Sequence, residues 1–479
     1  MAIIVAACSA SRCSLFAQSD TVASPVAVAV KAAAEVAGVN AVIWAFDRYV
    51  IANDVVYNID FGTMGRNLKR GFVWDNDRFS TNLLGHPYQG GLYFSAARSA
   101  GLSFWPSVPY SVAGSLMWEY LMENEPPSIN DFISTSIGGA ALGEITFRLS
   151  GLLIDNRATG LNRAGREILA AIISPMSGLN RVLSGSAWKV RSAEGELSGD
   201  ASVHFYMAAG YRALAGDSRV KSRLDNGMYV DAELSYGNLF SEDCEKPYDA
   251  FTLRTSFNLF SEQPLVGSVN VVGELWGENI PLKSATATLH WGVFQHFSYY
   301  DSNTVIAAQQ VSSYRLAEAA AVGVGAQLKA SVKGGATFVS SAYLTGILLG
   351  GTTTDYYRVT NRDYNMGNGF SSKLSAGLLG SKAGLGVKVE DYRLFTWKGY
   401  DPEANLSLLT AEEQRTLNAQ GDRGNARLTI YNLNFYYRFR KRCILSIQAS
   451  CYSRDSCYSH FPSVKRQLVE SKIGTGYLF

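Results

Sequence analysis

The sequence predicts an α+β membrane protein, in which an N-terminal helical unit precedes a transmembrane antiparallel β-barrel of about 12 strands. Three observations predict this fold class. From about residue 198 to the end, apolar and polar side chains alternate with period two. Apolar segments of helical length lie between Asp75 and Trp188. The first residues have the composition of an export leader.

The composition agrees with a β-rich chain that faces both lipid and water. The 479 residues include 45 Gly, 26 Tyr and 23 Phe, whereas charged residues make up only 18%. The formal net charge is +2. Such a balance gives no electrostatic reason to expect a nucleic-acid partner or a polybasic membrane patch.

The N-terminus reads MAIIVAACSASRCSLFAQSD, an apolar stretch followed by small residues. We predict a signal peptide over residues 1–18, cleaved after Gln18, and an N-terminal extension over 19–79. The usual basic start is missing, because the first basic residue is Arg12. Two alternatives stay open: a lipoprotein signal ending at Cys8, and an ordinary N-terminal helix.

Residues 80–190 are predicted to form the helical unit. The stretch PSVPYSVAGSLMWEYLMENE predicts a helix that follows two prolines and ends before Pro126. Ser128 is then expected to cap the next helix, with Asp131 at the third position in a variant of the capping box, and this helix runs to about Asp155. A further helix, NRAGREILAAIISPMSGLNRVL, is expected to be kinked or broken at Pro175.

These helices combine small residues with charges that would be costly in lipid. The small residues are Ser134, Gly138, Gly139, Ala141 and Gly143, and the charged ones are Glu119, Glu123, Asp131, Glu144 and Arg148. We therefore predict a tightly packed unit with buried acids. We expect it to plug the barrel lumen or to cap its periplasmic mouth.

Residues 191–479 are predicted to form the barrel. In one segment, for example, Val203, Phe205 and Met207 alternate with His204 and Tyr206. The segments are about 10 to 16 residues long and have aromatic residues at their ends, whereas strands of a soluble sandwich usually run about 5 or 6. The polar stretch 400–424 breaks the alternation and predicts a long outer loop with a short helix.

The last strand places Val469, Ile473, Tyr477 and the terminal Phe479 on one face. This ending resembles the C-terminal signal of Gram-negative outer-membrane barrels. The resemblance implies a bacterial outer-membrane location, outer-membrane lipid as surroundings, and the barrel-assembly machinery as a partner that reads the strand ending at Phe479.

Four cysteines remain after the predicted leader: Cys244, Cys443, Cys451 and Cys457. No pair has the spacing of a zinc site. Cys443 and Cys451 lie on one face of one strand, too far apart to bond. Cys451 or Cys457 could form a bridge, but four cysteines allow three pairings and the sequence does not choose between them.

His86, Glu119, Glu123, Asp131 and Glu144 are candidates for an acid/base or metal cluster. We expect no metal and no cofactor, because the Glu-x-x-His motif of di-iron bundles is absent. The architectural alternative has Asp131 as part of a cap and Glu144 paired with Arg148 at i, i+4. A hydrolase using Ser134 or Ser128 with His86 is a further possibility, although no G-x-S-x-G motif is present.

His290 and His296 are both expected to face the lumen, together with Thr286 and Thr288. They are about 20 Å apart along the strand and cannot chelate one ion together. We predict that they hydrogen-bond to the helical unit.

Three stretches together carry a resemblance to a known family: NLLGHPYQGGLYFSAARSAG, GSLMWEYLMENEPPSINDFISTSIGGAALGE and WGVFQHFSYYDS. They resemble an uncharacterised family of bacterial outer-membrane proteins, known as a domain of unknown function, in which a helical segment precedes barrel-like strands. The signature positions are filled here by His86, Pro87, Gly90, Glu119, Pro127, Ser128, Asn130, Asp131, Thr135, Gly138, Gly139, Gly143, Glu144 and Arg148. The resemblance implies no activity.

The sequence thus favours an outer-membrane barrel without enzymatic activity, either structural or a gated channel. The alternative is a lipid- or envelope-modifying enzyme with a site around His86, Asp131 and Glu144. A scaffold for partner proteins is the third class. A small-molecule or lipid ligand stays unidentified, and the sequence leaves open whether the protein is an enzyme.

Overall fold

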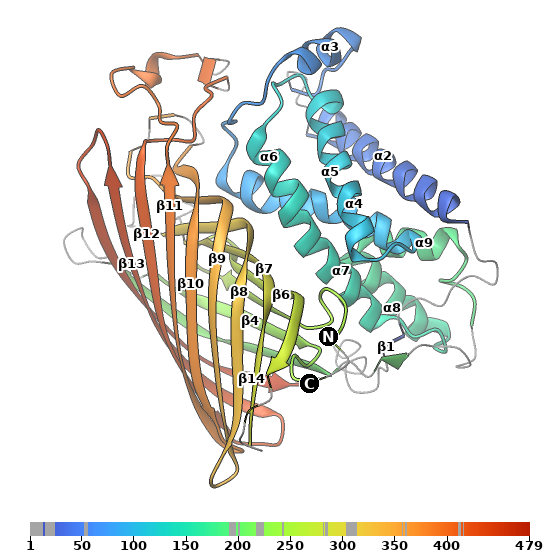
Figure 1. Ribbon diagram of the computed structural model, residues 1–479, viewed down its shortest axis with the longest axis vertical. Helices are drawn as coiled ribbons and strands as arrows, with labels where there is room; N and C mark the ends of the chain where they lie inside the picture. Colours follow the sequence, from blue (N-terminus) through green and yellow to red (C-terminus); the bar gives the residue numbers. More distant parts are fainter. Residues whose placement is uncertain are drawn as a thin grey trace. The chain divides into compact units, whose positions relative to one another are not determined.

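The computed structural model describes residues 13–14, 24–51, 56–190, 198–199, 202–216, 225–241, 244–280, 282, 286–302, 314–356, 358–359, 362–410, 413–414 and 416–479. The chain divides into two compact units. The first comprises residues 1–201 with 410–418, and the second comprises 202–409 with 419–479. Figure 1 draws the helices of the first unit in blue to green and the strands of the second in green to red.

The predicted leader falls outside the described residues, except for β1 (Cys13–Ser14), which pairs with β2 (Ser198–Gly199). The predicted extension contains two helices, α2 (Pro25–Tyr49) and α3 (Phe61–Lys69). An 18-residue window of α2 has mean hydropathy 1.7, and the helix is long enough to cross a membrane. Its Asn40 is nevertheless buried and donates to the carbonyl of Gly114 at 3.2 Å. Helical packing therefore begins earlier in the chain than we predicted.

The remaining helices of this unit are α4 (His86–Ala100), α5 (Phe104–Met117), α6 (Ile129–Ile133), α7 (Gly139–Leu153), α8 (Gly160–Ile173) and α9 (Pro175–Leu183). Three short π-helical segments join them: η1 (Thr81–Gly85), η2 (Trp118–Met122) and η3 (Ser134–Gly138).

Most of the predicted helix boundaries are confirmed. Ser128 caps α6 by accepting from the Asp131 amide, α6, η3 and α7 run on to Leu153, and the helices α8 and α9 are separate at Pro175. One start is wrong, because α5 begins at Phe104, before the two prolines. Pro106 falls in the first turn, where amides lack helical acceptors, whereas Pro109 lies inside the helix.

The helices α4 and α7 cross at glycines. A Cβ atom on Gly90 would lie 1.8 Å from the carbonyl oxygen of Thr135, and one on Gly139 would lie 2.6 Å from the backbone of Gly90. The single Ser111 hydroxyl of α5 lies within hydrogen-bond distance of both carbonyls of this crossing, Gly90 at 3.2 Å and Thr135 at 3.0 Å, and shares its proton between them. The prediction that small residues allow close approach is confirmed for Gly139 and Gly143.

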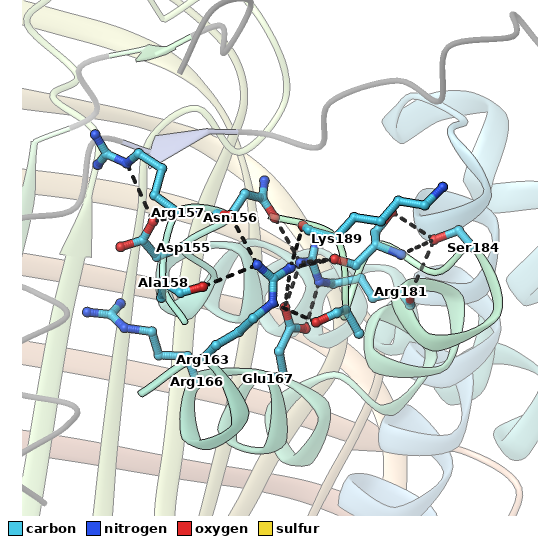
Figure 2. A network of polar contacts seen from close by, with 12 residues as sticks. Asp155, Asn156, Arg157, Ala158, Arg163, Arg166, Glu167, Arg181, Ser184 and Lys189 are labelled. Atoms are coloured by element: carbon cyan, nitrogen blue, oxygen red, sulfur yellow. Dashed lines mark hydrogen bonds and ion pairs between the residues drawn. The ribbon is translucent and has the colours of Figure 1, made fainter. Parts of the chain in front are cut away.

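Two buried arginines hold the end of the helical unit in place (Figure 2). The Arg163 guanidinium donates to the carbonyls of Ala187 at 2.6 Å, Ser186 at 2.7 Å and Lys189 at 2.9 Å. Arg181 of α9 forms a bidentate pair with Glu167 of α8, at 2.8 and 2.6 Å. Because these arginines satisfy backbone carbonyls after α9, we assign them a structural role.

The second unit is a closed antiparallel barrel of 12 strands. They are β3 (Val203–Gly216), β4 (Asp225–Tyr236), β5 (Phe251–Leu259), β6 (Val266–Ile280), β7 (Ala287–Asp301), β8 (Arg315–Val332), β9 (Ala336–Thr353), β10 (Tyr364–Leu379), β11 (Ala383–Thr396), β12 (Gly424–Arg438), β13 (Cys443–Tyr458) and β14 (Val464–Leu478). Each strand pairs with its sequence neighbours, and β14 pairs with β3 to close the barrel. The predicted fold class and strand number are confirmed.

Burial alternates along the strands as the sequence pattern predicts. Outward side chains are apolar and exposed, for example Tyr431, Leu433 and Phe435 of β12. Inward side chains include many charges, such as Arg212 of β3 and Glu470 of β14, which form an ion pair across the closing seam. An apolar outer surface around a polar interior is typical of a barrel that spans a lipid bilayer.

The connections at the two ends of the barrel differ in length. At one end three turns are short, 333–335, 380–382 and 439–442, and we call it the short-turn end, although the connection 237–250 between β4 and β5 at this end is longer. The opposite end has longer loops, such as 354–363 and 397–423. The latter includes the predicted long loop and holds the short 3-10 helix η4 (Leu406–Leu408). The first barrel strand starts, and the last one ends, at the short-turn end.

Within the described part of the chain, Cys443, Cys451 and Cys457 carry free thiols, so the bridge that we considered for Cys451 or Cys457 is not formed there.

Candidate functional site

One cluster of buried and partly buried ionisable groups in the helical unit lies where its three π-helical segments meet helices. We call it the carboxyl cluster and define it by Asp75, His86, Glu119 and Asp131. His86 directly follows η1, Glu119 lies in η2, and Asp131 lies just before η3. π-Helical segments often occur at functional sites, because they displace side chains and free backbone groups.

Asp131 is the centre of the cluster. Its Oδ1 lies 3.4 Å from Nε2 of His86 and accepts from Asn130 Nδ2 at 2.9 Å. Asn130 also donates to Asp75 at 2.8 Å, so one amide group joins the Asp75 and Asp131 carboxyls. Two carboxyls held close together disfavour the ionised form of each other.

Glu119 takes over a capping contact that a capping box would give to Asp131. In that box, the side chain at the third position accepts from the amide of the cap residue. Here the Ser128 amide donates to Glu119 Oε2 at 2.6 Å instead. Asp131 contributes its backbone amide to the Ser128 hydroxyl at 3.3 Å, so its carboxyl is left for Asp75 and His86.

Burial determines the protonation of the cluster. It raises the pKa of Asp131 well above the ordinary value, and the nearby Asp75 raises it further. Burial likewise raises the pKa of Glu119, against the effect of the Ser128 amide. The His86 pKa is lowered by burial, which outweighs the attraction of Asp75. Burial therefore favours the protonated form of the Asp131 carboxyl and the neutral form of the His86 imidazole.

Such an arrangement can hold and transfer a proton. A carboxyl with a raised pKa serves as a general acid near neutral pH, and a neutral imidazole serves as a base. Among the residues that the structure describes, no group of three or more His, Cys, Asp or Glu side chains is arranged to hold a metal ion.

Two of the predicted candidates lie elsewhere. The Ser134 hydroxyl donates to the backbone carbonyl of Asp131 at 3.4 Å, and no hydrogen bond joins it to the His86 ring in the described part of the chain. Glu144 is fully buried between two arginines, with Arg148 Nε at 2.7 Å and Arg98 Nε at 2.6 Å. The predicted Glu144–Arg148 pair is confirmed. Arg98 was missed as its second partner, because it lies on another helix and the sequence offers no signal for the contact.

The barrel histidines have partners within the barrel. His290 Nε2 lies 2.7 Å from Glu274 Oε1, and His296 Nδ1 lies 3.0 Å from Lys373 Nζ. Both rings point into the lumen, as predicted. The predicted hydrogen bonds to the helical unit are not found among the described residues, because β6 and β10 supply side chains that the strand pattern of β7 alone could not reveal. These histidines therefore give no argument for a helical plug.

The barrel lumen contains a cavity of about 760 Å³. It is lined by residues from the short-turn end, such as Tyr206, Arg438 and Leu478, and by ion-paired side chains further in, such as Arg254 and Lys388. Arg254 pairs with Glu233 at 3.0 Å, and Lys388 pairs with Glu390 at 2.8 Å. Charged walls of both signs surround this cavity.

Towards the long loops, a layer of buried apolar and aromatic side chains fills the lumen. We call it the lumen layer, and it comprises Leu214, Tyr300, Tyr314, Leu316, Ala321, Ile347, Tyr392, Leu394, Leu428, Ile430, Tyr452 and Leu468. The rings of Tyr314 and Tyr452 stack at 3.9 Å between centroids. The Tyr452 hydroxyl donates to Glu470 at 2.9 Å and thereby joins the layer to the charged wall.

Residues 71–176 match the family described as Domain of unknown function (DUF3943). The matched residues include the whole carboxyl cluster as well as Glu144 and Arg148. This confirms the resemblance stated from the sequence. A search of curated proteins finds no match to the chain.

Solved structures that resemble the barrel include porins and channels. The NanC porin is 11% identical, with a TM-score of 0.27, over 56% of this chain and 98% of that chain. An outer membrane channel from Pseudomonas putida F1 is 8% identical, with a TM-score of 0.26, over 58% of this chain and 95% of that chain. The anion-selective porin from Comamonas acidovorans is 9% identical, with a TM-score of 0.18, over 58% and 100%. The assignment of a closed barrel depends on the strand pairing and not on these likenesses.

Proposed function

We propose that the protein is a gated outer-membrane channel whose lumen is closed in the state described here. The exposed apolar outer face of the strands supports a place in a bilayer. Outer-membrane barrels have short periplasmic turns and longer extracellular loops, so the long loops here face outward and the charged cavity opens toward the periplasm.

The single observation that carries this proposal is the lumen layer. Large apolar side chains from strands around the barrel meet across the lumen, and each is at most 8% exposed. A hydrophobic constriction of this kind excludes water and ions, and its displacement opens the path. A charged cavity on one side of an apolar constriction is an arrangement that a purely structural barrel does not need.

Conductance across planar bilayers tests the proposal. The wild-type chain should show rare, discrete openings. Combined Tyr314→Ala and Tyr452→Ala substitutions should give steady conductance, because they remove the stacked ring pair. Tyr452→Phe is the matched control: it keeps the ring, loses only the hydroxyl, and should stay closed.

Deletion of residues 80–190 tests the predicted plug separately. Higher conductance of that variant would support a plug formed by the helical unit. Flat traces from the wild type, the double substitution and the deletion would rule out a channel and leave a structural barrel.

The alternative function is a lipid- or envelope-modifying enzyme, and the carboxyl cluster is the observation that favours it. Asp131, whose pKa is raised by burial, lies 3.4 Å from His86, whose pKa is lowered by burial, and this pair is arranged for acid/base chemistry. If this holds, His86→Ala should abolish the change that expression of the protein causes in the extracted envelope lipids, while the barrel still assembles. Loss of the folded protein in that variant would favour a structural role for His86.

A further inference from the structure

The outer surface of the barrel is hollowed near the short-turn end. An apolar groove of about 440 Å³ lies over β9–β12, and we call it the β9–β12 groove. Its apolar walls are Phe338, Leu378, Leu385, Val387 and Phe435. Leu378 and Leu385 are about half exposed, at 49% and 50%.

Gly377, Gly380, Gly384 and Gly386 also line this groove. Gly377, Gly384 and Gly386 alternate with the outward side chains of Leu378, Leu385 and Val387, so a Cβ on these glycines would point to the lumen side. At Gly384 that space is taken by the Tyr436 ring, 2.3 Å from where a Cβ would lie. The hollow on the outer face therefore lies between the larger outward side chains.

The turns beside the groove carry positive charge and no acid. The turn 380–382 runs from one groove residue, Gly380, to Lys382, and the turn 333–335 begins with Lys333. The turn 439–442 reads FRKR. Because β8–β13 are consecutive around the barrel, these three turns are neighbours on one side of its rim. In the described part of the chain, the ammonium groups of Lys333 and Lys382 take part in no ion pair, and both residues are exposed.

We propose that the β9–β12 groove binds an anionic phospholipid, with an acyl chain along the apolar walls and the head-group phosphate on Lys382 and Lys333. This rests on the proposed place of the barrel in a membrane, where the short-turn end meets the periplasmic leaflet. The two halves of the site match the two halves of such a lipid: burial of the acyl chain is favourable along apolar side chains, and lysine is a strong ligand for phosphate.

Native mass spectrometry of the full chain in detergent tests the proposal. Delipidated protein is mixed with phosphatidylglycerol or phosphatidylcholine that have identical acyl chains. We expect phosphatidylglycerol to bind more tightly, by about fivefold for each of the two lysines. Lys333→Ala combined with Lys382→Ala should reduce its binding to the level of phosphatidylcholine.

Two further variants separate the parts of the site. Ala376→Trp should fill the groove and weaken binding of both lipids, because Ala376 lines it. Lys465→Ala is the matched charge control, since it removes an exposed lysine next to the long-loop end and should leave the preference unchanged.

Equal binding of the two lipids by the wild type, or an unchanged preference in the double lysine variant, would overturn the inference. Heat-modifiable migration in gels shows independently whether the barrel is folded in detergent. A folded barrel without lipid preference rejects this site alone, whereas a chain that forms no barrel in detergent or membranes rejects the proposed function.

Discussion

Asp131 illustrates how one residue acquires its environment from several segments. Its amide takes part in the cap of α6, but its carboxyl is released from that cap because Glu119 accepts from the Ser128 amide at 2.6 Å. It then faces Asp75 and His86 in a buried position. An ionised carboxyl is costly to bury, so the Asp131 side chain destabilises the folded helical unit when it is ionised.

Asp131→Asn should reduce the dependence of the helical unit on pH. Because burial raises the pKa of Asp131 in the folded chain, the unfolded chain releases this proton first as the pH rises above about 4. Stability therefore falls from there up to the raised pKa. Asparagine keeps a donor toward Asp75 and has no proton to lose, so at pH 8 the variant should be more stable by about 1 kcal/mol.

Amide hydrogen exchange of residues 129–153 in the full chain, measured at pH 5 and pH 8 and corrected for intrinsic rates, checks this. Asp155→Asn is the control, because Asp155 is partly exposed, with 32% of its side chain accessible. If Asp131→Asn and the wild type lose the same protection between the two pH values, the assigned protonation is wrong.

Residue-level prediction from sequence succeeded where contacts are local. The Ser128 cap joins residues three apart, and the Glu144–Arg148 pair joins residues four apart. A helix fixes both spacings. It failed for Arg98, which reaches Glu144 from another helix 46 residues earlier. It also failed for the partners of His290 and His296, because strand alternation gives the face of a side chain but not its neighbour across the lumen.

At the scale of elements, the crossing of α4 and α7 depends on the absence of side chains. Gly90 and Gly139 bring the two backbones into contact, and the hydroxyl of Ser111 satisfies the carbonyls exposed there. The π-helical segment η3 begins next to this crossing. A close crossing of this kind positions the carboxyl cluster, because His86 begins α4 and Asp131 precedes η3.

Gly90→Ala should destabilise the helical unit by about 3 kcal/mol or more, since the new methyl group would lie 1.8 Å from a backbone oxygen that cannot move without shifting α7. Gly151→Ala in α7 is the matched control. It meets nothing within 4 Å and should be neutral or stabilising by up to about 1 kcal/mol. Thermal unfolding followed by tryptophan fluorescence compares them, and similar melting temperatures for the two variants would contradict the crossing.

The sequence predicted the type of most elements but not all their limits. Proline and capping residues are local signals, and they placed the start of α6 and the break at Pro175 correctly. The helices α2 and α3 were not predicted. The burial of Asn40 in α2 depends on Gly114 and Tyr93, which are distant in sequence. The π-helical segments leave no periodic signal, because each is only five residues long.

At the scale of the whole chain, the two ends of the barrel differ, which gives it a defined orientation in a membrane. Its first strand starts and its last strand ends at the short-turn end, and Phe479 packs against Phe205 there with ring centroids 5.1 Å apart. The Phe479 amide also donates to the Phe205 carbonyl at 2.9 Å. That the barrel-assembly machinery reads this end of the chain stays a prediction from the sequence.

This direction can be measured by cysteine labelling in a Gram-negative host. The native cysteines are first replaced by serine, and one cysteine is then introduced at either end. Ser407→Cys lies in the long loop 397–423, and Ser381→Cys lies in the short turn 380–382; both positions are exposed. Because long loops face outward in outer-membrane barrels, a membrane-impermeant maleimide should label Ser407→Cys on intact cells. It should label Ser381→Cys only after the outer membrane is opened.

The reverse pattern would mean that the charged cavity and the basic turns 333–335, 380–382 and 439–442 face the outside of the cell. Periplasmic entry to the lumen and a periplasmic phospholipid in the β9–β12 groove would then both be excluded. Labelling of both positions on intact cells would instead mean that the barrel is not inserted as proposed.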